Sequence, residues 1–418
     1  MSAVAAVRTQ LVGYRRILAL RDYRLLWSAQ VVSTFGDRLT QIGLIALVFA
    51  MTGSDRSIGL VLTLTVLPRA VFGLFAGALA DRVSRKTLLI ATDCARALIV
   101  LVLALAAELP LGAVYLLAAL HATATVFFTP TRYAVLPDIV PEHELLAANT
   151  LDETTQSGLD PVAYLIGGAL IAALGVRAGF GVDSVTFLAS AALIMLTTAR
   201  GAAQWHARRG GRSGADVAEP TNVGLGLGAG FRAIWQDHIL RANTLLLVTA
   251  AAVASAEMPL TAMLVLTHWR RGAMGLGILE ASLAVGFVLG AFTCGPLVDR
   301  LGKGPTILVG LIGTGVAMGA VAALPFWPAV ILNGVSGVFN LLFFVPTLTI
   351  TQERAPSSVR ARVMSSRAAL MAVALVASYA AATALASTFA PRLVMLAMGL
   401  LLTAGTAVAW QVPALRQR

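Results

Sequence analysis

The sequence predicts an all-α membrane protein with twelve transmembrane helices arranged as two similar halves of six. Three observations predict this fold. Only 12% of the 418 residues are charged, 58% are hydrophobic and the mean hydropathy is +0.83, whereas soluble domains carry about 25% charged residues. Apolar runs of spanning length recur along the chain. Two motifs of the first half return in the second half.

Each apolar run is long enough to cross a bilayer, because a spanning helix needs about 20 mostly apolar residues. Gly and Pro inside the runs are tolerable, since neighbouring helices can satisfy the freed backbone groups. The first six expected spans lie near residues 24–52, 57–80, 87–107, 111–133, 150–173 and 178–199. The second six lie near residues 240–263, 274–298, 306–324, 327–349, 363–389 and 392–412.

The distribution of Lys and Arg predicts the orientation. If the N-terminus is inside, most basic residues fall in inner segments, and few, such as Arg270 and Arg271, fall in outer loops. The positive-inside rule then places both termini in the cytoplasm and the chain in the inner membrane. The net charge of +11 is therefore assigned to membrane orientation, and no nucleic-acid partner is expected.

The expected organisation follows from these spans and the polar stretch between them. The Gly-rich basic run Arg208–Arg212 should be flexible, and Phe231–Trp235 should form a short interfacial helix. The predicted parts are a basic cytoplasmic lead-in (1–22), an N-terminal six-helix half (23–199), a cytoplasmic linker (200–238), a C-terminal six-helix half (239–412) and a cytoplasmic tail (413–418).

An internal repeat supports the division into halves. The segment Gly77–Lys86 after the second span returns as Gly295–Lys303 after the eighth, and Phe127–Thr131 in the fourth span returns as Phe343–Thr347 in the tenth. The two matches have nearly the same separation, which indicates duplication of a six-helix unit. Transporters built from such repeats bind their substrates near the bilayer midplane, between the halves.

The segment Gly77–Lys86 resembles the cytoplasmic signature motif of the major facilitator superfamily, with Ser84 in place of its second glycine. Further segments resemble the branch that contains macrolide-efflux proteins and enterobactin exporters, among them Phe35–Asp37, Asp183–Phe187 and Arg360–Ser365. This resemblance implies the major facilitator fold, a central cavity lined by spans 1, 4, 7 and 10, and proton-driven export of drugs or metabolites.

Charged residues within spans are costly and are functional candidates by default. Asp37 in the first span and Arg69 in the second lie at similar depths, and we expect them to form an ion pair or to share a polar network. The alternative is a bridge that only fixes two helices. Arg69 is further expected to tune nearby carboxylates or to bind an anion.

Five more polar residues complete the candidate substrate and proton site. Asp160 precedes Pro161 in the fifth span, and a carboxylate in a dehydrated site suits proton uptake and release. Glu257 precedes Pro259 in the seventh span in a similar way. For the remaining three, the alternative is structural: a hydrogen-bonded core histidine for the first, and hydrogen bonding between helices for the two asparagines. These three are His121, Asn333 and Asn340.

A second group of residues is expected to act in gating. Gly77 lets two helices approach closely, and Asp81 can meet a helix N-terminus and nearby guanidinium groups. Asp93 and Arg96 share one helix face near this loop. The alternative is a tight, positively charged turn between helices. The gating candidates are Gly77, Asp81, Arg82, Arg85, Lys86, Asp93, Arg96, Arg132, Asp299 and Arg300.

The predicted function is secondary active transport without enzymatic activity. The sequence has no metal-ligand spacing, nucleophile elbow or phosphate-binding loop, so no cofactor or metal is expected. We expect a monomer that exports an amphipathic or lipophilic solute by alternating access, coupled to proton influx, with multidrug resistance as an associated property. The alternatives are a lipid or lysolipid flippase, an uncoupled facilitator, and a scaffold or receptor that transports nothing.

Overall fold

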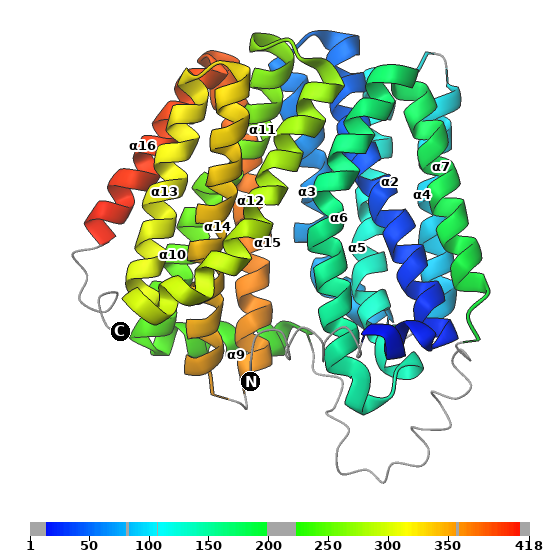
Figure 1. The fold of residues 1–418 in the computed structure, drawn as a ribbon, viewed down its shortest axis with the longest axis horizontal. Helices are drawn as coiled ribbons and strands as arrows, with labels where there is room; N and C mark the ends of the chain where they lie inside the picture. Colours follow the sequence, from blue (N-terminus) through cyan, green and yellow to red (C-terminus); the bar gives the residue numbers. More distant parts are fainter. Residues whose placement is uncertain (1–13, 81–82, 107, 199–222, 357–358, 410–418) are drawn as a thin grey trace. The chain divides into compact units, whose positions relative to one another are not determined.

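The computed structural model describes residues 14–80, 83–106, 108–198, 223–356 and 359–409, and these form helices joined by short turns (Figure 1). The helices group into two compact units. Unit 1 comprises Met1–Gly43 and Val71–Ala218, and unit 2 comprises Leu44–Ala70 and Glu219–Arg418. The chain therefore leaves unit 1 within its first long helix and returns to it within the second.

Unit 1 is built from six long helices, two of which continue into unit 2. In this unit α4 packs against both α5 and α7, and α4 and α7 lie side by side in Figure 1. Its helices are α2 (Arg21–Thr52), α3 (Asp55–Ala80), α4 (Arg85–Leu105), α5 (Leu111–Ile139), α6 (Leu145–Leu174) and α7 (Val176–Met195), with a short 3₁₀ turn at Glu142–Glu144.

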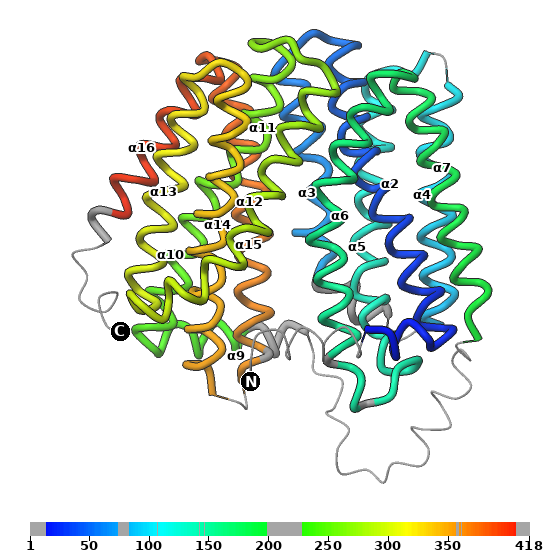
Figure 2. The backbone as a smooth tube through the Cα atoms, in the orientation of Figure 1, coloured from blue at the N-terminus to red at the C-terminus, as the bar shows by residue number. Residues whose placement is uncertain are grey.

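Unit 2 contains the remaining helices. Here α14 packs against α12 and α13, and α13 packs against α16, as the backbone trace in Figure 2 shows. Its helices are α9 (Val223–Gln236), α10 (His238–Ser255), α11 (Glu257–Met263), a π-helical turn (Leu264–His268), α12 (Gly272–Leu301), α13 (Lys303–Ala323), α14 (Phe326–Arg354), α15 (Arg360–Thr388) and α16 (Pro391–Ala409).

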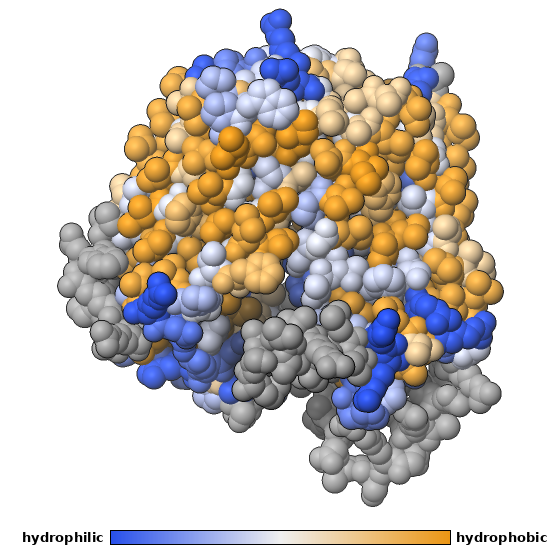
Figure 3. Space-filling view, viewed as in Figure 1, coloured by the Kyte–Doolittle hydropathy of each residue, from blue (hydrophilic) through white to orange (hydrophobic). Residues whose placement is uncertain are grey.

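The all-α membrane fold is confirmed. In the described residues eleven helical segments are long and apolar enough to cross a membrane. The expected seventh span corresponds to the segment His238–His268, and the expected twelfth to α16, whose apolar part Pro391–Thr406 is shorter than the others. Apolar side chains cover the middle of the helices, and hydrophilic ones gather at their ends (Figure 3). The count of twelve spans stays a prediction.

Close helix packing replaces the hydrophobic effect as the main attraction between helices, since lipid tails are as apolar as leucine. In unit 2, α12 and α14 approach through glycines. A Cβ atom on Gly286 would lie 2.9 Å from the Cα atom of Gly337, so neither position accepts a larger residue without moving a helix. In unit 1, Leu26, Leu89 and Ile194 belong to one buried cluster that joins α2, α4 and α7.

The helix expected at Phe231–Trp235 is confirmed. It is longer than expected, since α9 extends from Val223 to Gln236. It packs against α15 and α10. Ile234 is fully buried in a cluster with Ala355 and Val363, whereas Trp235 is exposed. The basic run Arg208–Arg212 lies outside the described residues.

Candidate substrate and proton site

Polar side chains join α2 and α6 along most of their length in unit 1. Their positions recur about once per turn on each helix, as the 3.6-residue period requires for one face. The bonds run from Tyr23 to Asp152 (3.0 Å), from Trp27 to Thr155 (3.0 Å), from Thr34 to Gln156 (3.1 Å), from Arg38 to Asp160 (2.8 Å) and from Tyr164 to Gln41 (3.0 Å), the donor being named first. Polar bonds thus hold these two helices in register.

The strongest of these links is the ion pair between Arg38 and Asp160. Arg38 Nε donates to Asp160 Oδ1 at 2.8 Å, and Nη2 donates to Oδ2 at 2.9 Å. Both side chains keep more than a quarter of their surface exposed, and the guanidinium lies 5.1 Å from the centre of the Tyr164 ring. Asp160 is therefore held by a cation, and the pair is accessible enough to exchange these bonds for bonds to a solute.

A second polar cluster surrounds Arg96 of α4. Its Nη1 atom lies 3.1 Å from Asp37 Oδ1, its Nη2 donates to Ser33 at 3.1 Å, and Nη2 also pairs with Asp93. Asp93 in turn accepts a bond of 2.7 Å from Ser190 of α7. The cluster therefore connects α2, α4 and α7.

This cluster gives Asp37 a partner that was not predicted, because its carboxylate is bound by Arg96. Arg69 belongs to unit 2, and its side chain is exposed. The expected link between Asp37 and Arg69 stays a prediction. The Arg96 guanidinium is fully buried and cannot remain without a counter-charge.

Aromatic rings complete the surroundings of Arg96. The guanidinium carbon lies 4.4 Å from the ring centres of both Phe128 and Phe187, a distance at which the ring faces attract a cation. His121 lies 5.5 Å from the Phe187 ring centre, and its Nε2 atom is 3.9 Å from Asp37 Oδ1. His121 is thus part of the same buried cluster as Asp37.

Arg132, expected in gating, forms a buried ion pair. Its Nη1 atom lies 2.6 Å from Asp152 Oδ2 and donates to Gln30 as well. Tyr23 donates to the other oxygen of the same carboxylate. Arg132 is 4% exposed, so its pairing with α6 contributes to holding α5, α6 and α2 together.

The signature loop is only partly described. Asp81 and Arg82 lie outside the described residues, and the side-chain surroundings of Gly77 are not described. Arg85 donates to the Ala134 carbonyl at 2.6 Å and pairs with Asp138 at 2.9 Å, at the C-terminal end of α5.

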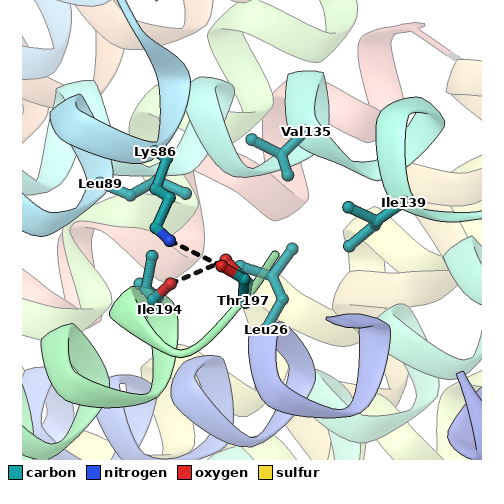
Figure 4. Close-up of a pocket in the computed structure, with 7 residues that line it drawn as sticks. All are labelled: Leu26, Lys86, Leu89, Val135, Ile139, Ile194 and Thr197. Carbon is teal, nitrogen blue, oxygen red and sulfur yellow. Dashed lines mark hydrogen bonds between the residues drawn. The ribbon is translucent and has the colours of Figure 1, made fainter. Parts of the chain in front are cut away.

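Lys86 caps the C-terminal end of α7. Its Nζ atom donates to the carbonyls of Met195 (2.8 Å) and Thr197 (2.6 Å), where a cation also interacts favourably with the helix dipole. Figure 4 shows the Lys86 side chain reaching Thr197 beside a pocket lined by Leu26, Val135 and other apolar side chains. Its volume of about 10 Å³ holds about one water molecule, which is too small for an organic solute.

The repeated loop in unit 2 reproduces part of this arrangement. Lys303, at the start of α13, pairs with Glu353 at the end of α14 at 2.5 Å, as Arg85 pairs with Asp138. Asp299 and Arg300 are exposed. The turn itself differs, because Gly302 adopts a φ of 89°, which favours glycine, whereas Ser84 has a φ of −56°.

The candidates of unit 2 lie on three helices. Glu257 begins α11 and is 4% exposed, and its Oε2 atom accepts a bond of 3.3 Å from Ser336 of α14. Asn333 donates to the Leu279 carbonyl (2.9 Å) and to Ser282 (3.2 Å) of α12. Asn340 donates to the Ser336 carbonyl of its own helix. Asn333 therefore forms hydrogen bonds between helices, which was the alternative to a role in the substrate site.

Three charged residues of these clusters were not predicted. Arg38 and Asp152 pair with predicted residues, and Asp183 accepts bonds from Thr40 and Thr186. The rule that charges within spans are functional candidates would have selected Arg38. The same rule would have selected Asp152 and Asp183, which lie within the expected spans 150–173 and 178–199. It does not identify their partners, which are far away in the sequence.

Comparison with known proteins gives a consistent result. A family model described as transmembrane secretion effector matches residues 17–417. The enterobactin exporter EntS of Salmonella typhi is 26% identical over 347 residues, which cover 81% of this chain and 80% of the exporter. Macrolide efflux protein A of Streptococcus pyogenes is 31% identical over 152 residues, 36% of each chain.

Solved structures show the same fold. A bacterial homologue of the human lysosomal transporter Spinster superposes with a TM-score of 0.69 at 16% identity, covering 95% of this chain and 97% of that chain. A POT family transporter in complex with 5-aminolevulinic acid has a TM-score of 0.72 at 12% identity, covering 93% and 95%. At these identities the similarity concerns the fold alone.

Proposed function

Because the chain belongs to the transmembrane secretion effector family of the major facilitator superfamily, we propose that it exports a siderophore-like or drug-like small molecule by alternating access, coupled to proton influx. The protein is a multi-pass membrane transporter. The proposal places it in the cytoplasmic membrane with both termini inside, in line with the distribution of Lys and Arg.

The observation that carries this proposal is the Arg38–Asp160 ion pair. It lies within two long apolar helices, yet both side chains remain partly exposed. A charged pair in a span is costly. A pair that only joins two helices needs no exposed surface, so a purely structural bridge would be fully buried. Its accessibility instead favours a role in binding a solute.

The pair offers two complementary groups to a polar solute. The guanidinium can donate hydrogen bonds to an oxygen of the solute, and the carboxylate can accept a bond from a hydroxyl or amine. The ring of Tyr164, beside the guanidinium, adds an apolar face. Such a combination suits an amphipathic molecule better than a simple ion, and both relatives named above export molecules of organic character according to their names.

Reconstituted vesicles provide the test. Purified full-length protein is placed in liposomes, and the movement of enterobactin and of erythromycin is measured with and without an imposed pH gradient. Accumulation that depends on the gradient is expected for at least one probe. Transport that is unaffected by the gradient would indicate an uncoupled facilitator, and no transport of either probe would contradict the proposed substrate class.

The binding role of the pair is tested by Arg38→Gln and Asp160→Asn. Each should raise the substrate concentration needed for half-maximal transport by about tenfold or more, since one lost charged hydrogen bond is worth about 1.5–3 kcal/mol. The matched control is Arg56→Gln, because Arg56 is exposed on the first turn of α3. Equal kinetics for all three variants would show that the pair does not bind the solute.

A further inference from the structure

Glu257 occupies an unusual position in the span His238–His268. It follows a break between α10 and α11, where the Ala256 N–H bonds the Val253 carbonyl in a tighter turn. Pro259 accounts for the break, because it has no N–H to donate to the preceding turn. The same span ends in a π-helical turn, Leu264–His268, and such turns are frequent at functional sites.

The carboxyl of Glu257 has little to stabilise a negative charge. Glu257 is 4% exposed, and its one hydrogen-bond donor among the described residues is Ser336, at 3.3 Å. The other oxygen, Oε1, is buried and has no hydrogen-bond partner in the described part of the chain. An ionised carboxylate without such partners is strongly disfavoured in a dry site.

The charged groups near Glu257 also disfavour a negative charge on its carboxyl. Among the described residues, Glu280 of α12 is the charged group that acts electrostatically on Glu257, and it has the same sign. The elements packed against α11 are α10, the π-helical turn Leu264–His268, α15 and α16, and from α15 the neutral Tyr379 bonds the adjacent Met258. No described arginine or lysine offsets a charge on Glu257.

The other embedded carboxylates of the candidate site differ in this respect. Asp37 and Asp93 are bound by Arg96, and Asp160 is bound by Arg38. In each of these pairs a guanidinium lies against the carboxylate and supplies a counter-charge. Among the predicted substrate and proton carboxylates, Glu257 is therefore the one without a guanidinium in the described residues. Asp183, which was not predicted, is also buried without an ion pair in the described residues and accepts bonds from Thr40 and Thr186.

We infer that Glu257 is the residue that binds the coupling proton, in a site formed with Ser336 beside the α10–α11 break. This inference rests on the proposed function. The carboxylate takes one proton from water, becomes a neutral carboxyl, and returns that proton to water on the other side. No other reactant is needed. The broken backbone at Ala256 provides a place where the span can bend to open the site.

The protonation itself is tested without any substrate. Infrared difference spectra of the full-length protein in lipid, recorded while pH is changed, show the carbonyl stretch of a protonated carboxyl. The wild type should show such a band, and Glu257→Gln should lose it, because an amide cannot bind this proton. Asp160→Asn and Glu280→Gln are the controls and should retain it. An unchanged band in Glu257→Gln would overturn the assignment.

The coupling is tested in vesicles with the probes named above. Gln has the shape of a protonated Glu and can still accept the bond from Ser336, so Glu257→Gln should fold and should exchange enterobactin or erythromycin between the two sides. It should lose all accumulation driven by a pH gradient. Retained gradient-driven accumulation would overturn the inference, as would wild-type transport that is driven by sodium and lost in Glu257→Gln.

The two tests separate the inference from the proposed function. If the wild type moves neither probe, the proposed substrate class fails, while the infrared band still decides whether Glu257 binds a proton. If the wild type transports a probe but the band does not depend on Glu257, the export function stands and the proton site lies elsewhere.

Discussion

Arg96 and Asp37 form an ion pair between α4 and α2 in which the two partners have different surroundings. Nη1 of Arg96 lies 3.1 Å from Oδ1 and 3.2 Å from Oδ2 of Asp37. The arginine side chain has no exposed surface, whereas 26% of the aspartate side chain is exposed. The arginine is thus a fixed internal cation, and the aspartate extends from it towards accessible space.

Removing this cation should destabilise the protein strongly. In Arg96→Met the carboxylates of Asp37 and Asp93 lose their shared partner, and breaking a buried ion pair costs about 3–5 kcal/mol. Thermal unfolding in detergent should show a much lower midpoint than for the wild type. The control is Cys94→Ala on the exposed side of the same helix, and a similar loss in both variants would argue against a special role for Arg96.

Arg38 and Asp160 should be energetically coupled. Arg38→Gln and Asp160→Asn each leave a charged partner without its counter-charge, whereas the double variant leaves none. Interacting pairs typically show a coupling of about 0.5–3 kcal/mol, and the bidentate geometry favours the upper part of this range. A double-mutant cycle of thermal unfolding measures the coupling. Strictly additive effects would show that the two hydrogen bonds contribute nothing to stability.

The contact between α9 and α15 should depend on Gly230. A Cβ atom at this position would meet the carbonyl of Arg362 and the hydroxyl of Ser366, whereas a Cβ atom on Gly228 would meet nothing within 4 Å. Forcing a side chain into a tight contact costs about 1–3 kcal/mol. Hydrogen exchange of Val223–Gln236 should therefore become faster in Gly230→Ala. It should stay slow in Gly228→Ala, and equal rates would contradict the docking.

Asp237 should stabilise the start of α10 in a pH-dependent way. It accepts bonds from the N–H groups of Ile239 and Leu240 and pairs with Arg354. Although partial burial raises the pKa of Asp237, the Leu240 N–H, the Arg354 guanidinium and the Ile239 N–H together hold this pKa below its ordinary value of 3.8. A lowered pKa means that the stabilisation is complete above 3.8 and is lost as pH falls through the folded-state value.

Asp237→Ala should therefore be less stable than the wild type near pH 7, by about 1 kcal/mol as for other helix caps. The difference should shrink at pH values below 3.8. Asp237→Asn keeps a capping oxygen without the charge, so it should lose less stability than Asp237→Ala near pH 7, and its deficit relative to the wild type should also shrink at pH values below 3.8. Thermal unfolding between acidic and neutral pH measures all three proteins, and a constant difference for Asp237→Ala would contradict the assigned cause.

The sequence was a good guide to the helices. Spans were predicted from the length of apolar runs, and the described helices follow those runs closely, including the helix in the linker. This works because backbone polar groups in a bilayer must be satisfied within the helix itself. The repeat also reappears in three dimensions, since Arg85–Asp138 and Lys303–Glu353 occupy corresponding helix ends.

The partners of the charged residues could not be predicted in the same way. Asp37 meets Arg96, a pair that was not predicted, and Asp160 meets Arg38, which lies more than 100 positions earlier. Depth in a span can be counted along the chain. Counting residues does not show which distant helix a side chain faces.

The amino-acid sequence shows that this chain forms apolar helices of spanning length, that it contains a repeat, and which few residues carry charge inside those helices. These properties depend on neighbours along the chain and on the solvent. Which charges neutralise each other follows from the tertiary structure, and so does the finding that Glu257, among the predicted substrate and proton carboxylates, has no cation beside it in the described residues. That outcome depends on which helix faces meet, and packing between residues far apart in sequence sets those faces.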